Sequence, residues 1–191
     1  YLDRPEINII SIENPVERRI PGINQVEIGA NITFASALRT VLRQDPDIVL
    51  VGEIRDEMTA KMAVRGALTG HLIIASIHAK NAEGVLSRLN ELGISDDMLR
   101  QTIVAIVFQK LLPLYCYLCD GTCGIYCSKF PVNHKRSSLY DILRSDHIET
   151  EIMNSSLNAS EKRDRSFNHL LKKVYAYGFI SEDTYFQYFI P

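Results

Sequence analysis

Residues 45–78 read DPDIVLVGEIRDEMTAKMAVRGALTGHLIIASIH, and this stretch decides the fold. Its first part, Ile48–Val51, is four apolar residues in a row and is rich in β-branched side chains, which is typical of a buried parallel strand. Apolar residues within 57–69 recur at helical spacing, and Gly70 follows as a stop signal. A second apolar run begins at Leu72. The stretch therefore predicts a strand, a helix and a second strand.

The composition of the whole chain is that of an ordinary globular protein. It has 191 residues, of which 46% are hydrophobic and 23% charged, with a formal net charge of -2. This charge gives no overall field that would attract nucleic acid or anionic lipid, so we expect no direct binding of nucleic acid. No apolar run approaches the roughly 20 residues needed to span a bilayer. We expect a cytoplasmic protein, peripheral to the membrane through its partners.

Three segments resemble motifs of the secretion ATPase superfamily, the hexameric motors of type II secretion, type IV pili and competence pili. Residues 42–56, LRQDPDIVLVGEIRD, resemble the Walker B box, and residues 69–78, TGHLIIASIH, resemble the His box. Upstream, residues 9–17, IISIENPVE, resemble the Asp box. Among the subfamilies, the segment HAKNAEG and the later cysteine cluster look most like the competence pilus ATPases of Gram-positive bacteria.

The resemblance implies a fold, a reaction and partners. The fold would be a RecA-like α/β core of the P-loop NTPase type. The reaction would be ATP hydrolysis with Mg²⁺ in a homo-hexamer, which acts with an inner-membrane platform protein to assemble a competence pilus or a type II secretion pseudopilus. Two alternatives stay open: an inactive fragment that only binds subunits or the platform, and a zinc-dependent interaction module.

One expected motif is missing from the sequence. The pattern G-x-x-x-x-G-K-[ST], whose backbone amides cradle phosphates and whose Lys reaches the outer ones, does not occur. In the family this loop lies upstream of the Asp box. We therefore expect the chain to be the carboxyl-terminal part of a longer protein, with a RecA-like core that lacks its P-loop strand.

Carboxylates form the predicted catalytic set. Glu53 follows the first predicted strand, and open α/β sheets bind ligands outside the carboxyl ends of their strands. The resemblance gives Glu53 the role of orienting the attacking water. It gives Glu17 the role of the Asp box carboxylate that places water and metal, and it groups Glu13 with the residues that sense the nucleotide. Asn14 stands where the family usually has Asp, which removes a charge. Solvated loop carboxylates are the alternative for Glu13 and Glu17.

Arginines supply candidate phosphate contacts. Thr33 is a plausible N-cap for a helix that carries Arg39 and Arg43 on one face, four residues apart. A planar guanidinium suits phosphate oxygens. The resemblance supports this role for Arg39 and Arg55. For Arg43, a solvated basic face is an equal alternative.

Histidines flank the second predicted strand at His71 and His78. Side chains alternate between the faces of a strand, so residues an odd number apart are not expected to act as one pair of ligands. Taken alone, each is more often a core or surface histidine. The resemblance places both with nucleotide sensing: it makes His78 a γ-phosphate sensor, whereas His71 would stabilise the helix-to-strand turn or a subunit contact.

All four cysteines of the chain fall within residues 116–127 with the spacing C-x2-C-x3-C-x3-C. In a reducing compartment such a cluster favours metal over disulfides, and tetrahedral zinc takes four soft ligands. An iron–sulfur cluster or free thiols remain alternatives, because the spacing is shorter than in most zinc ribbons. The candidate ligands are Cys116, Cys119, Cys123 and Cys127.

Weaker patterns complete the chain. Residues 18–28 favour a hairpin or loop. Apolar spacing predicts helices over 81–92 and 95–112, the second stopped by Pro113. The last third predicts a short helix, a polar linker and an amphipathic helix, over residues 138–144, 154–160 and 167–175. The resulting domains are an ATPase core, a Cys-rich loop and a helical carboxyl-terminal region, over residues 1–113, 114–136 and 137–191.

Overall fold

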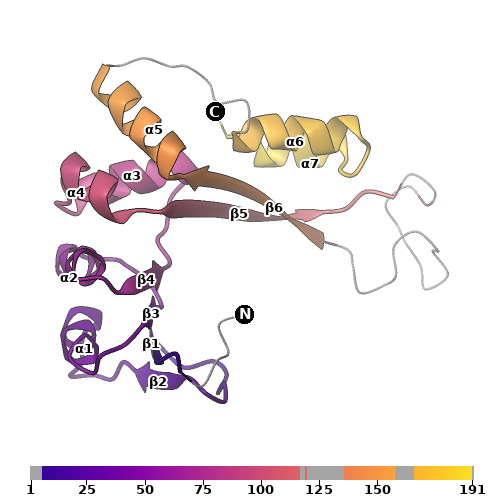
Figure 1. Ribbon diagram of the computed structural model, residues 1–191. Coiled ribbons are helices and arrows are strands. Elements are labelled where there is room, and N and C mark those ends of the chain that lie inside the picture. Colours follow the sequence, from indigo (N-terminus) through magenta and orange to yellow (C-terminus); the bar gives the residue numbers. More distant parts are fainter. Residues whose placement is uncertain (1–5, 117–118, 120–135, 158–165, 191) are drawn as a thin grey trace. The chain divides into compact units, whose positions relative to one another are not determined.

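The computed structural model of the chain describes residues 6–116, 119, 136–157 and 166–190. These residues form two compact units (Figure 1). The first contains residues 6–79 and 84–103, and the second contains residues 80–83 and the described residues from 104 onward. This division lies upstream of the predicted boundary at residue 113, because residues 105–113 form a strand of the second unit.

A parallel sheet forms the centre of the first unit. Its strands are β1 (Ile9–Glu13), β2 (Asn24–Glu27), β3 (Ile48–Val51) and β4 (Leu72–Ala75). They lie in the order β2-β1-β3-β4, and each neighbouring pair is parallel. The strands predicted from the two apolar runs are therefore confirmed as β3 and β4.

The hairpin or loop expected over residues 18–28 is wrong in its last part, which forms β2. This strand pairs in parallel with β1, with Ile10 opposite Asn24. A hairpin joins antiparallel strands, so the segment cannot be one. The parallel pairing places Gln25 beside Ser11, a neighbour that the local pattern of turn residues does not reveal.

Two helices cover one face of this sheet. They are α1 (Phe34–Val41) and α2 (Glu57–Leu68), and Figure 1 shows both on the same side of the strands. Thr33 caps α1, as the sequence predicts. The Asp56 carboxylate caps α2 by accepting hydrogen bonds from the Thr59 backbone N–H at 2.9 Å and from its hydroxyl at 2.8 Å. The first turn of α2 is thereby fixed directly after β3.

The hydrophobic core of the first unit is built from alternate strand positions. Paired residues in a parallel sheet point to the same face, so Ile10 and Ile12 share a face with Val49 and Val51. All four are at most 3% exposed. Further buried apolar side chains come from the helices: Ala37, Leu38, Val41, Ala60 and Ala63.

Two further helices belong mainly to the first unit. The predicted helix over 81–92 is confirmed as α3 (Ala82–Glu91), and Gly93 follows it at a φ of +79°. After a short connection, α4 (Asp96–Thr102) begins at the N-cap Ser95 and contacts α2. The chain leaves the helical conformation at Ile103, which is extended at ψ 116°.

β4 forms one edge of the sheet. Among the described residues it pairs only with β3. Its side chains Leu72 and Ile74 share the face away from Val49 and are 48% and 42% exposed. Parallel strands are normally buried on both faces, and an exposed apolar edge invites pairing with another chain.

We therefore expect the purified chain to associate as its concentration rises, through the edge at β4. An Ile74→Lys variant should lower this association, because a charge on an edge strand opposes pairing. Met58→Lys is the matched control, since Met58 is 53% exposed on α2 rather than on the sheet edge. Sedimentation velocity measures the effect. A chain that stays monomeric at high concentration would contradict the prediction.

The second unit contains a two-stranded antiparallel ribbon, β5 (Ala105–Pro113) and β6 (Arg136–Arg144). The helix predicted over residues 95–112 is therefore wrong after Thr102, and so is the short helix over 138–144. Burial at alternate positions is typical of strands. The buried residues are Ile106, Phe108 and Leu112 from β5 and Asp141 and Leu143 from β6.

Three helices follow the ribbon: α5 (Ser145–Leu157), α6 (Phe167–Ala176) and α7 (Glu182–Tyr188). The predicted polar linker over 154–160 is wrong for its first four residues, which lie in α5, and the others fall outside the described residues. The amphipathic helix predicted from residue 167 is confirmed as α6. None of the helices in the described ranges is long and apolar enough to cross a membrane.

A buried carboxylate ties the ribbon to α6. Asp141 is fully buried on β6, and its Oδ2 accepts a hydrogen bond of 3.1 Å from the backbone N–H of Phe167. The N-cap residue Ser166 makes no side-chain capping bond of its own. Phe167 also packs edge-on against Phe108 of β5, with 5.2 Å between the ring centres. Asp141 on β6 therefore caps the first turn of α6.

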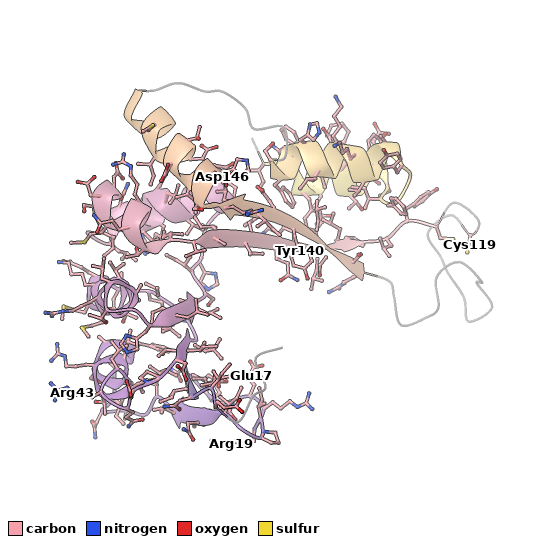
Figure 2. The ribbon with its side chains drawn as sticks, viewed as in Figure 1. Glu17, Arg19, Arg43, Cys119, Tyr140 and Asp146 are labelled. Carbon is pink, nitrogen blue, oxygen red and sulfur yellow. The ribbon has the colours of Figure 1, made fainter. Side chains whose placement is uncertain are left out.

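An Asp141→Ala variant should lower the free energy of unfolding by about 2 kcal/mol, because it removes a buried hydrogen bond and a helix cap together. Asp146→Ala is the control, since Asp146 is exposed at the start of α5 (Figure 2), and it should cost about 0.5 kcal/mol or less. Urea denaturation measures both. Equal values for the two variants would refute the capping role.

Candidate functional site

A cavity of about 340 Å³ lies at the carboxyl ends of β1 and β3. This is the edge of a parallel sheet at which α/β proteins bind ligands. Three of the predicted site carboxylates and one predicted arginine contribute to its wall. The lining residues are Glu13, Asn14, Pro15, Glu17, Phe34, Gly52, Glu53 and Arg55.

Gly52 allows the end of β3 to approach β1. A Cβ atom at this position would lie 3.0 Å from the carbonyl oxygen of Ile12 and 3.5 Å from the ring of Phe34. The Gly52 N–H donates to the same Ile12 oxygen at 2.8 Å. A side chain here would push the two strand ends apart. The glycine therefore holds Glu53 close to the end of β1.

Glu53 is the centre of a small charged cluster. Its side chain is 15% exposed, and its Oε1 forms an ion pair with Nε of Arg55. Its Oε2 lies 3.4 Å from Nε2 of His78. Glu53 and Arg55 of the Walker B segment thus meet His78 of the His box segment at one carboxylate.

The backbone ladder explains why His78 reaches Glu53. Backbone hydrogen bonds continue between the two segments that follow β3 and β4. Ser76 N–H donates to Val51 O at 3.3 Å, and Ile54 N–H donates to Ser76 O at 2.9 Å. The Ser76 hydroxyl also donates to the Gly52 carbonyl. The segment that carries His78 is therefore fixed beside the segment that carries Glu53. The imidazole itself is 92% exposed.

Glu13 is held by two hydrogen bonds to one of its oxygens. Its Oε1 accepts from the hydroxyl of Ser11 at 2.5 Å and from the amide of Gln25 at 2.9 Å. These donors, Ser11 first, hold the pKa of Glu13 below its usual range, with a smaller contribution from Arg19. The folded pKa is lowered, so this stabilisation is present above the unfolded pKa and is lost as the pH falls through the folded one.

The other predicted residues lie in different places. Glu17 is exposed in the loop after β1, where it borders the cavity (labelled in Figure 2). Arg39 is exposed on α1 and is absent from the lining of this cavity within the described chain. Arg43 lies on the side of the unit away from Glu17 (Figure 2).

His71 lies at the amino end of β4, whereas the cavity lies at the carboxyl ends of the strands. It precedes β4, whereas His78 follows that strand. Its Nδ1 lies 3.1 Å from the carbonyl oxygen of Gly66 and 3.1 Å from the hydroxyl of Thr69. These contacts fit the alternative role considered for His71, stabilisation of the turn from helix to strand. The structure does not bring it together with Glu53.

Ser11 and Gln25 are contacts that the sequence patterns missed. Ser11 is the one polar residue within the apolar run of β1 and is 3% exposed. A polar residue inside a buried strand needs a hydrogen-bond partner, which is a signal that could have singled it out. Gln25 carries no such signal, because its relation to Glu13 depends on the pairing of β2 with β1.

The chemistry of the cavity can be compared with the needs of Mg²⁺. Carboxylate oxygens are ligands that this ion prefers, and Glu13, Glu17 and Glu53 border one cavity. Within the ranges that the structure describes, no three His, Cys, Asp or Glu side chains are arranged to ligate an ion directly. The carboxylate oxygens that border the cavity nevertheless suit a cation in their chemistry.

The cysteine cluster is only partly described. Cys116 is buried, and the Sγ atoms of Cys116 and Cys119 are 3.6 Å apart. Two sulfurs bound at about 2.3 Å to one tetrahedral zinc would be about 3.8 Å apart. The other two predicted ligands, Cys123 and Cys127, lie outside the described residues.

Comparison with known sequences supports the resemblance. Residues 1–177 match the family of type II/IV secretion system proteins. ComGA, a competence protein, is 40% identical in Halalkalibacterium halodurans over 187 residues, which are 95% of this chain and 51% of that protein. In Bacillus subtilis it is 35% identical over 181 residues, or 93% and 51% of the two chains. The type IV pilus assembly ATPase PilB of Thermus thermophilus is 47% identical over 117 residues, 60% of this chain and 13% of PilB.

Comparison with solved structures supports the fold. The crystal structure of the pilus retraction motor PilT with bound ADP has a TM-score of 0.73 and 27% identity, and it covers 96% of this chain and 53% of PilT. The ATPase DotB of Legionella pneumophila, at 23% identity and a TM-score of 0.69, covers 94% of this chain and 50% of DotB. The expected fold class, a partial RecA-like α/β core, is confirmed.

The present chain spans about half the length of the ComGA proteins that it matches. The family match nevertheless extends over most of its residues and contains the whole cavity. The chain therefore belongs to the type II/IV secretion system protein family.

Proposed function

We propose that this chain is part of an ATP-hydrolysing hexameric motor that drives assembly of a competence pilus or a type II secretion pseudopilus. The observation that carries the proposal is the position of Glu53, a largely buried carboxylate at the end of β3 that is paired with Arg55 and lies near His78. Hydrolysis of a γ-phosphate needs such a group to orient the attacking water, and the carboxyl edge of a parallel sheet is where it acts.

The residues around Glu53 would contact the hydrated Mg²⁺ and the γ-phosphate. A bound Mg²⁺ neutralises charge on the phosphates, and Glu13 and Glu17 would hold its water shell. Arg55 and His78 would respond to the γ-phosphate, because both meet the same carboxylate. Arg39, exposed on α1, would reach a nucleotide only in a neighbouring subunit of the hexamer.

Family membership supports the proposed partners. Relatives carry the names competence protein, type II secretion system protein E and pilus assembly ATPase. We propose the cytoplasmic face of the membrane as the site of action, with the platform protein of the pilus or secretion machine as the partner. The formal net charge of -2 argues against direct binding of nucleic acid.

A chimera tests the proposal. In it, this chain replaces the matching part of Bacillus subtilis ComGA, to which it is 35% identical over 181 residues. The purified chimera should form hexamers and hydrolyse ATP, and in a strain that lacks ComGA it should restore DNA uptake. Unaltered ComGA is the positive control. A folded, hexameric chimera without ATP hydrolysis would contradict the proposal. ATP hydrolysis without DNA uptake would exclude the role in a competence pilus and leave the role in type II secretion.

A second candidate is a catalytically inactive module that binds subunits or the membrane platform. The observation that favours it is the absence of G-x-x-x-x-G-K-[ST] from these 191 residues. In that case the chimera would assemble, and a Glu53→Gln substitution would leave its behaviour unchanged.

We also propose that the cysteine cluster holds one structural zinc ion, which would take no part in hydrolysis. Protein purified without chelator should contain about one zinc per chain, and a Cys119→Ser/Cys123→Ser variant should lose it. Elemental analysis measures the content. The spacing of the four cysteines within residues 116–127 is the ground for the proposal, and a folded protein without metal would refute it.

A further inference from the structure

Three polar side chains lie together on one face of β1 and β2. Ser11 and Glu13 are two residues apart on the same strand, and the parallel register places Gln25 directly opposite Ser11. Successive strand residues alternate between faces, so all three share the face away from Ile10 and Ile12. The register of two strands, rather than a single motif, assembles this group.

Both hydrogen bonds within the group end on the same atom. Ser11 Oγ donates to Oε1 of Glu13 at 2.5 Å, and Gln25 Nε2 donates to that oxygen at 2.9 Å. Ser11 is 3% exposed, so its hydroxyl is fixed in this direction by burial as well as by the bond. The second carboxylate oxygen, Oε2, takes part in no hydrogen bond within the described chain, while the side chain borders the cavity.

Gln25 also fixes the loop between β1 and β2. Its Nε2 donates to the carbonyl of Arg18 at 2.9 Å, and its Oε1 accepts from the N–H of Ile20 at 2.8 Å. One side chain therefore joins the carboxylate of Glu13 to the loop that carries Arg18 and Arg19. Loss of this amide would release the carboxylate and the loop together.

We propose that Ser11 and Gln25 are positioning residues that fix one oxygen of Glu13, so that the other is offered to a water molecule bound to a divalent cation in the cavity. A freely rotating carboxylate side chain loses conformational entropy when it binds, and one already fixed by its neighbours loses less. Hydrogen bonds of this kind behind a metal-binding group typically change affinity or activity by 10- to 100-fold. The inference rests on the proposed ATP hydrolysis for its catalytic part.

The charged surroundings of Glu13 are mixed. Arg19 lies near it in the loop, and Glu27 stands opposite it in the register of β2. Glu17, Glu53 and Arg55 border the same cavity. The two donors to Oε1, Ser11 first, lower the pKa of Glu13.

Carboxyl NMR of the present chain tests the positioning without any enzymatic activity. The chain is labelled with ¹³C-glutamate, and the signal of Glu13 is identified from its loss in Glu13→Gln. The pKa of Glu13 should rise in Ser11→Ala and in Gln25→Leu, because each removes a donor to the ionised form. Ser87→Ala and Gln101→Leu, at exposed helix positions, are the matched controls and should leave it unchanged. An unchanged pKa in both test variants would overturn the inference.

The ComGA chimera tests the catalytic part. Ser11→Ala and Gln25→Leu should each lower kcat by about tenfold with little change in KM, and Ser11→Thr, which keeps the hydroxyl, should restore kcat. Unchanged kcat in both variants of an active chimera would overturn this part. A chimera that hydrolyses no ATP at all would instead refute the proposed function, and the NMR titration would still decide whether Ser11 and Gln25 position Glu13.

Discussion

Replacement of Glu53 by Gln should lower kcat of the ComGA chimera by about 100-fold or more, with little change in KM for ATP. The substitution keeps the size of the side chain and removes only its charge and its ability to accept a proton. Glu53 is the carboxylate that combines low exposure with pairing to Arg55 and proximity to His78, so its loss removes the group best placed to orient water. Steady-state phosphate release measures the effect.

Glu91→Gln is the matched control for this prediction. Glu91 is exposed at the end of α3, far along the chain from the cavity residues, and it pairs with Arg88 on the surface. The same loss of charge there should leave kcat within about twofold, since exposed pairs contribute little. A Glu53→Gln chimera that keeps its turnover and its melting temperature would remove Glu53 from the catalytic role.

The present chain by itself should neither hydrolyse ATP nor bind it tightly. The phosphate-binding loop supplies a row of backbone N–H groups and a Lys to the phosphates, and the sequence contains no such loop. Three of the four charged side chains that line the cavity at β1 and β3 are carboxylates, which repel phosphate oxygens unless a cation lies between them.

Two measurements check this prediction. Phosphate release by the chain should equal that of its Glu53→Gln variant, and calorimetric titration with Mg²⁺ and ATP should show no binding below millimolar concentration. Restoration of hydrolysis in the chimera would then assign the missing contribution to the segment that ComGA supplies. Release clearly above the Glu53→Gln level would contradict the prediction.

The strand–helix–strand unit around Glu53 could be predicted because its signals are local. Four consecutive apolar residues in β3, helical spacing in α2 and the glycine after it each reflect the conformation of the residues that carry them. The carboxylate at the strand end follows from the same pattern, since the direction of a parallel strand fixes the edge at which Glu53 must lie.

The ribbon of the second unit could not be predicted in this way. Residues 103–112 are apolar at both helical and alternate spacing, and the local sequence does not choose between them. Pairing with β6 decides the conformation, and the partner of Pro113 is Arg136, more than twenty residues away. Asp141 shows the same dependence: an acid in an isolated segment reads as exposed, yet here it is buried because it caps α6.

By itself, the sequence determined the unit of β3, α2 and β4, the helices α1 and α3, and the identity of the carboxylates, arginines and histidines in the motifs. Only the tertiary structure decided which of these residues meet. In the folded chain His78 lies beside Glu53, whereas His71 lies at the amino end of β4, because the two histidines stand at opposite ends of this short strand. The tertiary structure also gave Glu13 its two donors, since the register between separate strands sets which side chains become neighbours.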